Sequence, residues 1–141
     1  INERQFRNIY LKAIQKKGNT TENLVGILER RLDTVAYRSK FAMTVFSARQ
    51  LINHGHVKVN GKKVNIPSYL VKADDTIEIK DKSKELAIIV GSVDSKERDV
   101  PEYIQMDEKN KKAKLIRVPK FSEIPYPTIM EPSLVIEYYS R

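Results

Sequence analysis

The chain opens with apolar positions spaced three or four residues apart, as on one face of a helix. Residues 3–17 carry this spacing, and Gly18 then offers a natural helix end. A second helix is predicted over residues 22–38, where an apolar stripe runs from Leu24 to Val35. Basic residues that fall off this stripe are expected to point toward solvent or a ligand.

A third, shorter helix is predicted over residues 45–54. The Thr44 hydroxyl can cap its first turn, and Gly55 can close its last turn. Its apolar positions are expected to face inward and Arg49 outward. Residues 30–55 therefore contain helices whose polar faces are basic.

A β-hairpin is predicted where Asn60-Gly61 separates two alternating segments, because both positions of the tightest hairpin turn need a positive φ. A two-residue loop places Lys58 opposite Lys63. Opposed lysines destabilise a strand pair by a few tenths of a kcal/mol. A phosphate between them would reverse that sign, whereas solvation of both long side chains is the alternative explanation.

The remaining pattern predicts short strands and turns, followed by an irregular proline-rich connection. Its elements are expected at residues 76–80 (strand), 86–93 (short helix), 103–107 and 114–118 (strands), and 134–139, an apolar segment that docks back onto the rest.

Composition narrows the class of protein. With 40% hydrophobic and 31% charged residues, the chain has a globular balance, and no run approaches the ~20 apolar residues of a membrane helix. Cysteine is absent, which excludes disulfides and thiolate metal sites. His54 and His56 lack a third ligand nearby, so we expect neither a metal nor a cofactor. The chain begins at Ile1 rather than Met, and we expect residues upstream of it.

Positive charge is concentrated in one stretch. Of the net charge of +8, residues 30–63 contribute +7, from eight Lys or Arg and a single acid, Asp33. The other 18 basic and 17 acidic residues nearly cancel. A local excess of this size is typical of a surface that binds a polyanion. A merely solvated surface usually mixes both signs.

The sequence contains no motif of a known catalytic site. There is no Gly-rich phosphate loop and no Ser-centred elbow, and two histidines alone do not make a triad. The carboxylate pair Asp74-Asp75 is explained by a turn. We therefore expect that the protein is not an enzyme.

One part of the sequence resembles a known RNA-binding module. The resemblance rests on Arg31-Leu32-Asp33, on Arg38, and on the run Ala48-Arg49-Gln50-Leu51-Ile52-Asn53-His54-Gly55-His56-Val57-Lys58-Val59-Asn60-Gly61-Lys62. This is the module named after ribosomal protein S-four, which also occurs in some tRNA synthetases, pseudouridine synthases and heat-shock RNA-binding proteins. Further matches resemble the bacterial S-four family itself, in its alphaproteobacterial form: Asn2-Glu3-Arg4-Gln5-Phe6-Arg7, Val64-Asn65-Ile66-Pro67-Ser68-Tyr69 and Ile136-Glu137-Tyr138-Tyr139-Ser140-Arg141.

The resemblance implies an α+β fold in two parts. Residues 1–29 and the returning segment 119–141 would form a helical domain. Residues 30–118 would form an inserted RNA-binding domain whose module core, about 31–95, packs two helices on a small, mainly antiparallel sheet. The family's N-terminal segment, which binds zinc in some members, is not among these residues.

The resemblance also implies a function and partners. The family binds small-subunit ribosomal RNA early in assembly, contacts protein S-five, influences decoding accuracy and lies near the mRNA entry path. The location would be the ribosome of the bacterial cytoplasm, or an organellar ribosome, and no membrane is involved. The alternatives are an RNA-binding accessory domain of an RNA-modifying or aminoacylating enzyme, and a free RNA chaperone with the same module.

Twelve residues form the expected RNA-contact set, which combines cations with amides and imidazoles that can fix register. They are Arg30, Arg31, Arg38, Lys40, Arg49, Gln50, His54, His56, Lys58, Asn60, Lys62 and Lys63. Three members have a structural alternative: Arg31 could pair with Asp33, His54 could cap a helix end, and Asn60 could serve only the hairpin turn.

Overall fold

The computed structural model describes residues 3–15 and 20–125 and divides the chain into two compact units. One unit comprises Ile1–Glu29 with Pro119–Arg141, and the other comprises Arg30–Val118. The predicted docking segment at 134–139 lies outside the described residues.

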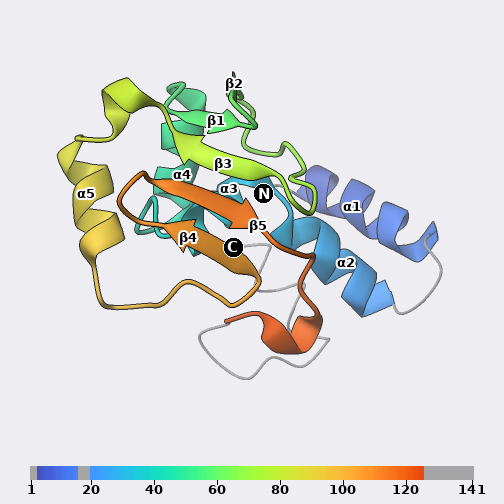
Figure 1. Ribbon diagram of the computed structural model, residues 1–141. Coiled ribbons are helices and arrows are strands. Elements are labelled where there is room, and N and C mark those ends of the chain that lie inside the picture. Colours follow the sequence, from blue (N-terminus) through green and yellow to red (C-terminus); the bar gives the residue numbers. More distant parts are fainter. Residues whose placement is uncertain (1–2, 16–19, 126–141) are drawn as a thin grey trace. The chain divides into compact units, whose positions relative to one another are not determined.

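The first unit contains two helices, α1 (Glu3–Gln15) and α2 (Thr20–Glu29), and a short 3-10 turn, η2 (Phe121–Glu123) (Figure 1). The fully buried Ala13 marks the face that α1 turns to α2, and the Asn23 side-chain amide donates to the Ala13 carbonyl at 3.2 Å. The Phe121 amide donates to the Glu22 carboxylate at 2.8 Å, so the chain returns to α2 after the second unit.

The predicted helix over residues 22–38 is wrong in one respect, because the chain breaks it into α2 and α3 (Leu32–Arg38). The break has a backbone cause. The Val71 amide donates to the Arg30 carbonyl at 2.7 Å, and the Leu32 amide donates to the Tyr69 carbonyl at 2.7 Å. These contacts with residues 67–71 replace the helical hydrogen bonds that the apolar stripe alone would predict.

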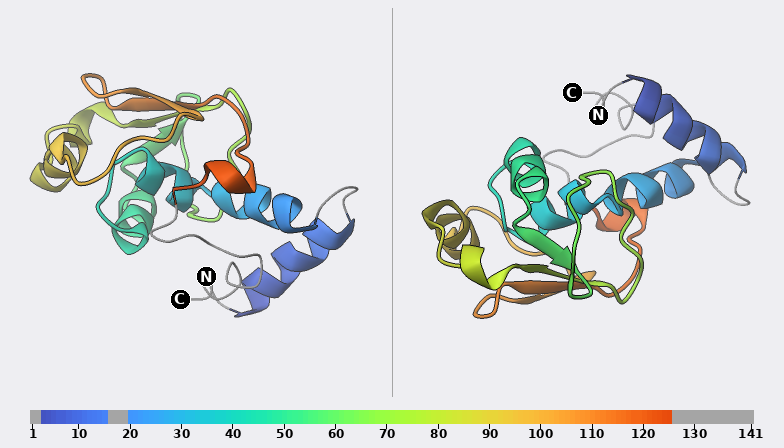
Figure 2. Two further views of the ribbon diagram at one scale, coloured as in Figure 1. Left: turned by 90° about the horizontal axis from the view of Figure 1, so that it is seen from below. Right: turned by 90° about the horizontal axis from the view of Figure 1, so that it is seen from above.

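The second unit packs α3 and α4 (Val45–Asn53) on one face of a five-stranded antiparallel sheet (Figures 1 and 2). The strand order is β2-β1-β3-β5-β4. The strands are β1 (Val57–Val59), β2 (Lys62–Lys63), β3 (Thr76–Ile79), β4 (Ile104–Asp107) and β5 (Lys112–Leu115). A 3-10 turn, η1 (Asp81–Ser83), and helix α5 (Ala87–Asp94) connect β3 to β4. The fold is therefore α+β, as predicted.

The core of this unit lies between the sheet and the two helices. Alternation in β3 buries Ile77 and Ile79 completely, and they share one cluster with Leu32 of α3 and Ile52 of α4. Burying one such side chain stabilises the fold by about 1.5–3 kcal/mol. The opposite face of the sheet carries polar side chains, such as Thr76 and Glu78 of β3.

The predicted third helix and the hairpin are both confirmed. Thr44 is the N-cap of α4, and its hydroxyl accepts from the Ser47 amide at 3.0 Å. At the hairpin turn, Asn60 and Gly61 have φ of 50° and 82°, and Lys58 pairs with Lys63 as the two-residue loop requires.

Later elements follow the prediction with one shift. The short helix expected over 86–93 is α5. The strand expected at 114–118 is β5, Lys112–Leu115: it begins directly after Lys111, which takes a positive φ of 52°, and it ends three residues before the expected end. Among the described residues, none of the helices is long and apolar enough to cross a bilayer.

Candidate nucleic-acid interface

Three of the expected contact residues are buried in the second unit. Arg31, Arg38 and Lys40 are 6%, 6% and 8% exposed. Of the two expected directions, toward solvent or a ligand, the solvent direction is therefore wrong for Arg31 and Arg38. The Lys40 ammonium donates to the Ser95 carbonyl, and the Arg38 guanidinium lies 5.5 Å from the Tyr37 ring centroid. In the free protein, these cations are occupied with internal contacts.

Asp33 joins two of the expected arginines. Its carboxylate is completely buried and accepts from Arg31 Nε at 3.2 Å and from Arg31 Nη2 at 3.1 Å. Arg49 Nε donates to the same carboxylate at 2.9 Å from across the α3–α4 contact. The alternative of a structural Arg31–Asp33 pair therefore describes the structure. Arg49 is held from one side while about a third (33%) of its side chain stays exposed.

Arg30 is also held from one side. Its Nε donates to the Val71 carbonyl at 2.8 Å, and its side chain remains half-buried. Gln50 and His54 are exposed on α4 and at its C-cap, respectively. Gln50 and His54 therefore lie a few residues before the hairpin, whose first strand begins at Val57.

The outer face of the sheet carries one row of charges that crosses all five strands. From β2 to β4, directly paired positions are Lys63, Lys58, Glu78, Lys112 and Asp107. On the β3-β5-β4 side the signs alternate, and Lys112 lies 3.7 Å from the Glu78 carboxylate. Only the hairpin end has two adjacent positive charges. Lys58 also lies directly opposite Glu78, whose carboxylate is the one that Lys112 approaches, so the row has one positive charge in excess, at its β1-β2 end.

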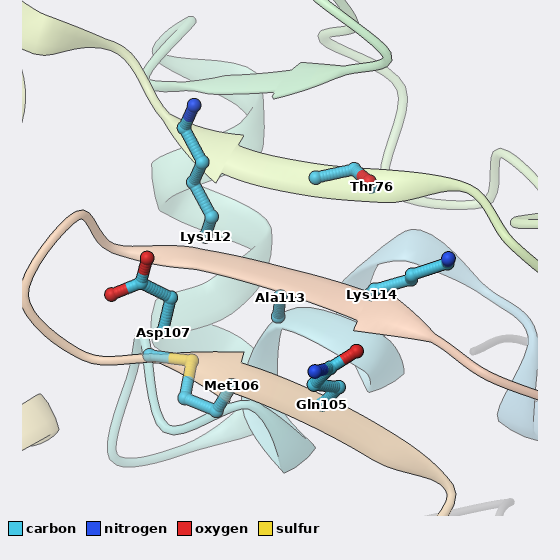
Figure 3. Close-up of a pocket in the computed structure, with 7 residues that line it drawn as sticks. All are labelled: Thr76, Gln105, Met106, Asp107, Lys112, Ala113 and Lys114. Atoms are coloured by element: carbon cyan, nitrogen blue, oxygen red, sulfur yellow. The ribbon is translucent and has the colours of Figure 1, made fainter.

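The β3-β5-β4 side of this face has an open hollow of about 200 Å³ (Figure 3). Figure 3 shows Lys112 and Lys114 of β5 with Asp107 and Gln105 of β4 around it. Lys114 lies 3.7 Å from the Asp74 carboxylate. Because its cations are matched by neighbouring carboxylates, this hollow has no electrostatic preference for a polyanion.

Asn60 has a structural task at the hairpin tip. Its amide nitrogen donates to the Asp75 carboxylate at 2.9 Å, and its amide oxygen accepts from the Thr76 amide at 2.9 Å. Lys62, beside it, is exposed. The tip is thereby fixed to the start of β3, which holds the lysines of the hairpin in place.

The two histidines come together at the base of the hairpin. The His54 and His56 ring centroids are 6.3 Å apart, and His56 Nδ1 lies 2.7 Å from the buried Ser83 hydroxyl. Burial lowers the pKa of His56, and the positive charges of Lys80, His54 and Lys63 lower it further.

Lys80 was not among the expected contact residues, although it belongs to this cluster. Its backbone amide donates to the His56 carbonyl at 2.9 Å, which sets the end of β3 beside the start of β1. Only the pairing of these strands brings Lys80 there, and no local pattern in the sequence reveals that pairing.

The interface that results is the hairpin end of the sheet with the adjoining end of α4. Its exposed or half-exposed cationic and titratable side chains are Arg49, His54, His56, Lys58, Lys62, Lys63 and Lys80. Such a surface can neutralise phosphates and release their counterions. Within the described ranges, 3–15 and 20–125, no group of three metal-ligating side chains comes together.

Comparison with known proteins identifies the family. Residues 30–77 match the model of the S4 domain. Over all 141 residues the chain is 72% identical to small ribosomal subunit protein uS4 of Pelagibacter ubique, 59% identical to that of Granulibacter bethesdensis and 57% identical to that of Gluconacetobacter diazotrophicus. Each alignment covers 100% of this chain and 69% of the relative. The chain belongs to the family of small ribosomal subunit protein uS4.

Proposed function

We propose that the protein is a structural constituent of the small ribosomal subunit and binds small-subunit ribosomal RNA directly. The observation that carries this proposal is the uncompensated positive charge at the hairpin end of the sheet, where Lys58 and Lys63 are paired across β1 and β2. Adjacent like charges destabilise a strand pair unless an anion lies against them. Because the chain belongs to the uS4 family, we propose that this anion is a phosphate of the small-subunit ribosomal RNA.

The binding is expected to recognise shape more than sequence. A-form RNA presents phosphates and 2′-hydroxyls at its surface, while its deep major groove hides the base edges. The hairpin and α4 present mainly cations and amides, and Phe46, 66% exposed, is the one Phe, Tyr or Trp side chain of α4. A junction of several RNA helices, in which phosphates from separate strands converge, fits this surface.

The role in the subunit extends the RNA contact. We place the protein among those that bind the ribosomal RNA early, nucleating the folding of the subunit body. With protein S-five it would contribute to translational accuracy, near the path by which mRNA enters. The buried Asp33 network supports the early role, because it orders the interface before RNA is bound.

Two linked measurements test the proposal. The purified protein should bind a small-subunit ribosomal RNA transcript from Pelagibacter ubique, and the affinity should fall by on the order of 10³ between tens of millimolar and ~0.2 M salt if about six contacts are ionic. In cell extracts the protein should sediment with small ribosomal subunits. A nearly flat salt series, or a protein found only in the free pool, would contradict the proposal.

A further inference from the structure

The base of the hairpin gathers four side chains that carry, or can acquire, positive charge. They come from four different places in the second unit: His54 ends α4, His56 precedes β1, Lys63 lies on β2 and Lys80 follows β3. The full sequence contains two histidines, and both are here. A proton taken up by histidine near neutral pH is therefore taken up in this cluster.

The placement of Lys63 depends on Gly55. A Cβ built on Gly55 would lie 2.5 Å from Lys63 Cε and 2.8 Å from its Nζ, so the lysine end lies across the bare glycine backbone. Gly55 also has a φ of 80°, which disfavours other residues. The turn after α4 thus brings the Lys63 ammonium beside the imidazoles.

The His56 ring is held through one of its two nitrogens, and the other nitrogen is open. Its Nδ1 lies 2.7 Å from Ser83 Oγ, which fixes the ring, and Ser83 is 2% exposed. Across the part of the chain that the structure describes, Nε2 of His56 has no hydrogen-bond partner. A fixed, half-exposed imidazole with one open nitrogen can donate to an anion once it is protonated.

Within the free protein, the groups that act on His56 discourage that protonation. Lys80, His54 and Lys63 all lower its pKa, in addition to the effect of burial. The nearest acidic group on η1, Asp81, is matched with Lys84 at 2.9 Å. The cluster therefore has Lys63 on β2 and Lys80 after β3, and no carboxylate is among the groups that act on His56.

We infer that His54, His56 and Lys63 form a seat for one backbone phosphate of the bound RNA, and that RNA binding takes up protons at this seat. A phosphate there would offset the repulsion from Lys63 and Lys80 and favour the imidazolium forms. By linkage, RNA affinity then rises as the pH falls toward 6. This inference rests on the proposed function, since RNA supplies the phosphate.

The test compares RNA affinity at pH about 7.6 and about 5.8 at constant ionic strength, a range that spans the ordinary histidine pKa. The RNA is the Pelagibacter ubique small-subunit transcript. Wild type should bind roughly three- to tenfold more tightly at the lower pH, because one unit of pKa change corresponds to a factor of about ten. The double variant His54→Gln, His56→Gln should reduce this ratio to near one.

A second measurement uses the unaltered protein, in case the double variant folds poorly. Calorimetric titration with the RNA, in two buffers of different ionisation enthalpy, reports proton uptake directly. Uptake near pH 6.5 supports the inference. Lys109→Gln, which removes a charge from the β4–β5 turn, is the control and should leave the pH ratio unchanged.

Tight RNA binding with no pH dependence and no proton uptake would contradict the phosphate seat at His54, His56 and Lys63, and would leave the proposed function standing. Loss of RNA binding at every pH would instead contradict the proposed function, and the seat with it. Inorganic phosphate tests the other source of the same group. If it raised the NMR titration midpoints of the imidazoles in the free protein as far as RNA does, the seat would belong to free phosphate rather than to RNA.

Discussion

Arg49 Nε lies 2.9 Å from Asp33 Oδ2, and this contact ties the single cation of α4 to a fully buried carboxylate of α3. Arg31 holds the same carboxylate with two hydrogen bonds. The contact gives Arg49 a structural task in addition to its proposed RNA contact. It also fixes the position from which the exposed part of the guanidinium would meet a phosphate.

Asp33→Asn should destabilise the protein by about 3 kcal/mol or more, because it leaves the buried Arg31 without its counter-charge. Chemical denaturation measures this. Asp74→Asn is the matched control: Asp74 is exposed, and asparagine tolerates its positive φ of 71°. The control should stay within ~0.5 kcal/mol of wild type. Equal stabilities for the two variants would contradict the role assigned to Asp33.

Arg49→Ala should lower both RNA affinity and stability, the latter by roughly 1–2 kcal/mol, because Asp33 loses a charged partner that is one-third exposed. Lys58→Ala should lower RNA affinity alone, since its side chain has no ion pair within the described residues. Comparing the two variants separates an effect on stability from an effect on RNA binding. If Arg49→Ala left the denaturation midpoint unchanged, the Asp33 contact would be dispensable.

Gly55→Ala should destabilise the protein by about 1–3 kcal/mol, because the new Cβ meets both an unfavourable φ and the Lys63 side chain. Gly91→Ala, inside α5 with no atom within 4 Å of the new Cβ, should instead stabilise by about 0.5–1 kcal/mol. Thermal unfolding of both variants measures the contrast. Effects of the same sign would contradict the tight approach at Gly55.

The stability of the free protein should decline as the pH falls below about 6.5. The pKa of His56 is lowered on folding, so the unfolded chain binds more protons in this window. The stability that neutral His56 contributes is fully present at a pH above the histidine pKa of the unfolded chain. It is lost as the pH falls through the lower pKa that His56 has in the folded protein. His56→Gln should remove this part of the slope in denaturation at pH about 7.5 and about 5.5. An unchanged slope would mean that another group titrates.

Local sequence signals predicted the local structure. Thr44 and Asn60-Gly61 specify a cap and a turn by their own chemistry, so α4 and the hairpin register followed directly. The helix break at Arg30 and Arg31 was not predictable in this way. It depends on hydrogen bonds to residues 67–71, which are distant in sequence.

The candidate interface was predictable in outline for a similar reason. Charge density marked residues 30–63, and the two-residue loop placed Lys58 opposite Lys63, as in the structure. Charge alone could not tell a surface cation from Arg31, which is buried against Asp33. Nor could it place Lys80 beside His56, because only the β1–β3 pairing does so.

The substitution Lys63→Glu tests the central claim, that the hairpin end of the sheet meets ribosomal RNA. In the free protein it replaces the repulsion with Lys58 by a cross-strand ion pair and should stabilise by a few tenths of a kcal/mol. In the complex it places a carboxylate against a phosphate and should weaken binding by far more. Lys109→Glu, the same charge change in the β4–β5 turn, is the control.

The decisive measurement is therefore the affinity of Lys63→Glu for the small-subunit ribosomal RNA at low salt, beside that of Lys109→Glu. The account predicts at least about tenfold weaker binding for Lys63→Glu, corresponding to about 1.4 kcal/mol, with unfolding stability equal to or above wild type. Unchanged affinity, or a loss no larger than that of Lys109→Glu, would contradict the account and place the RNA on another face.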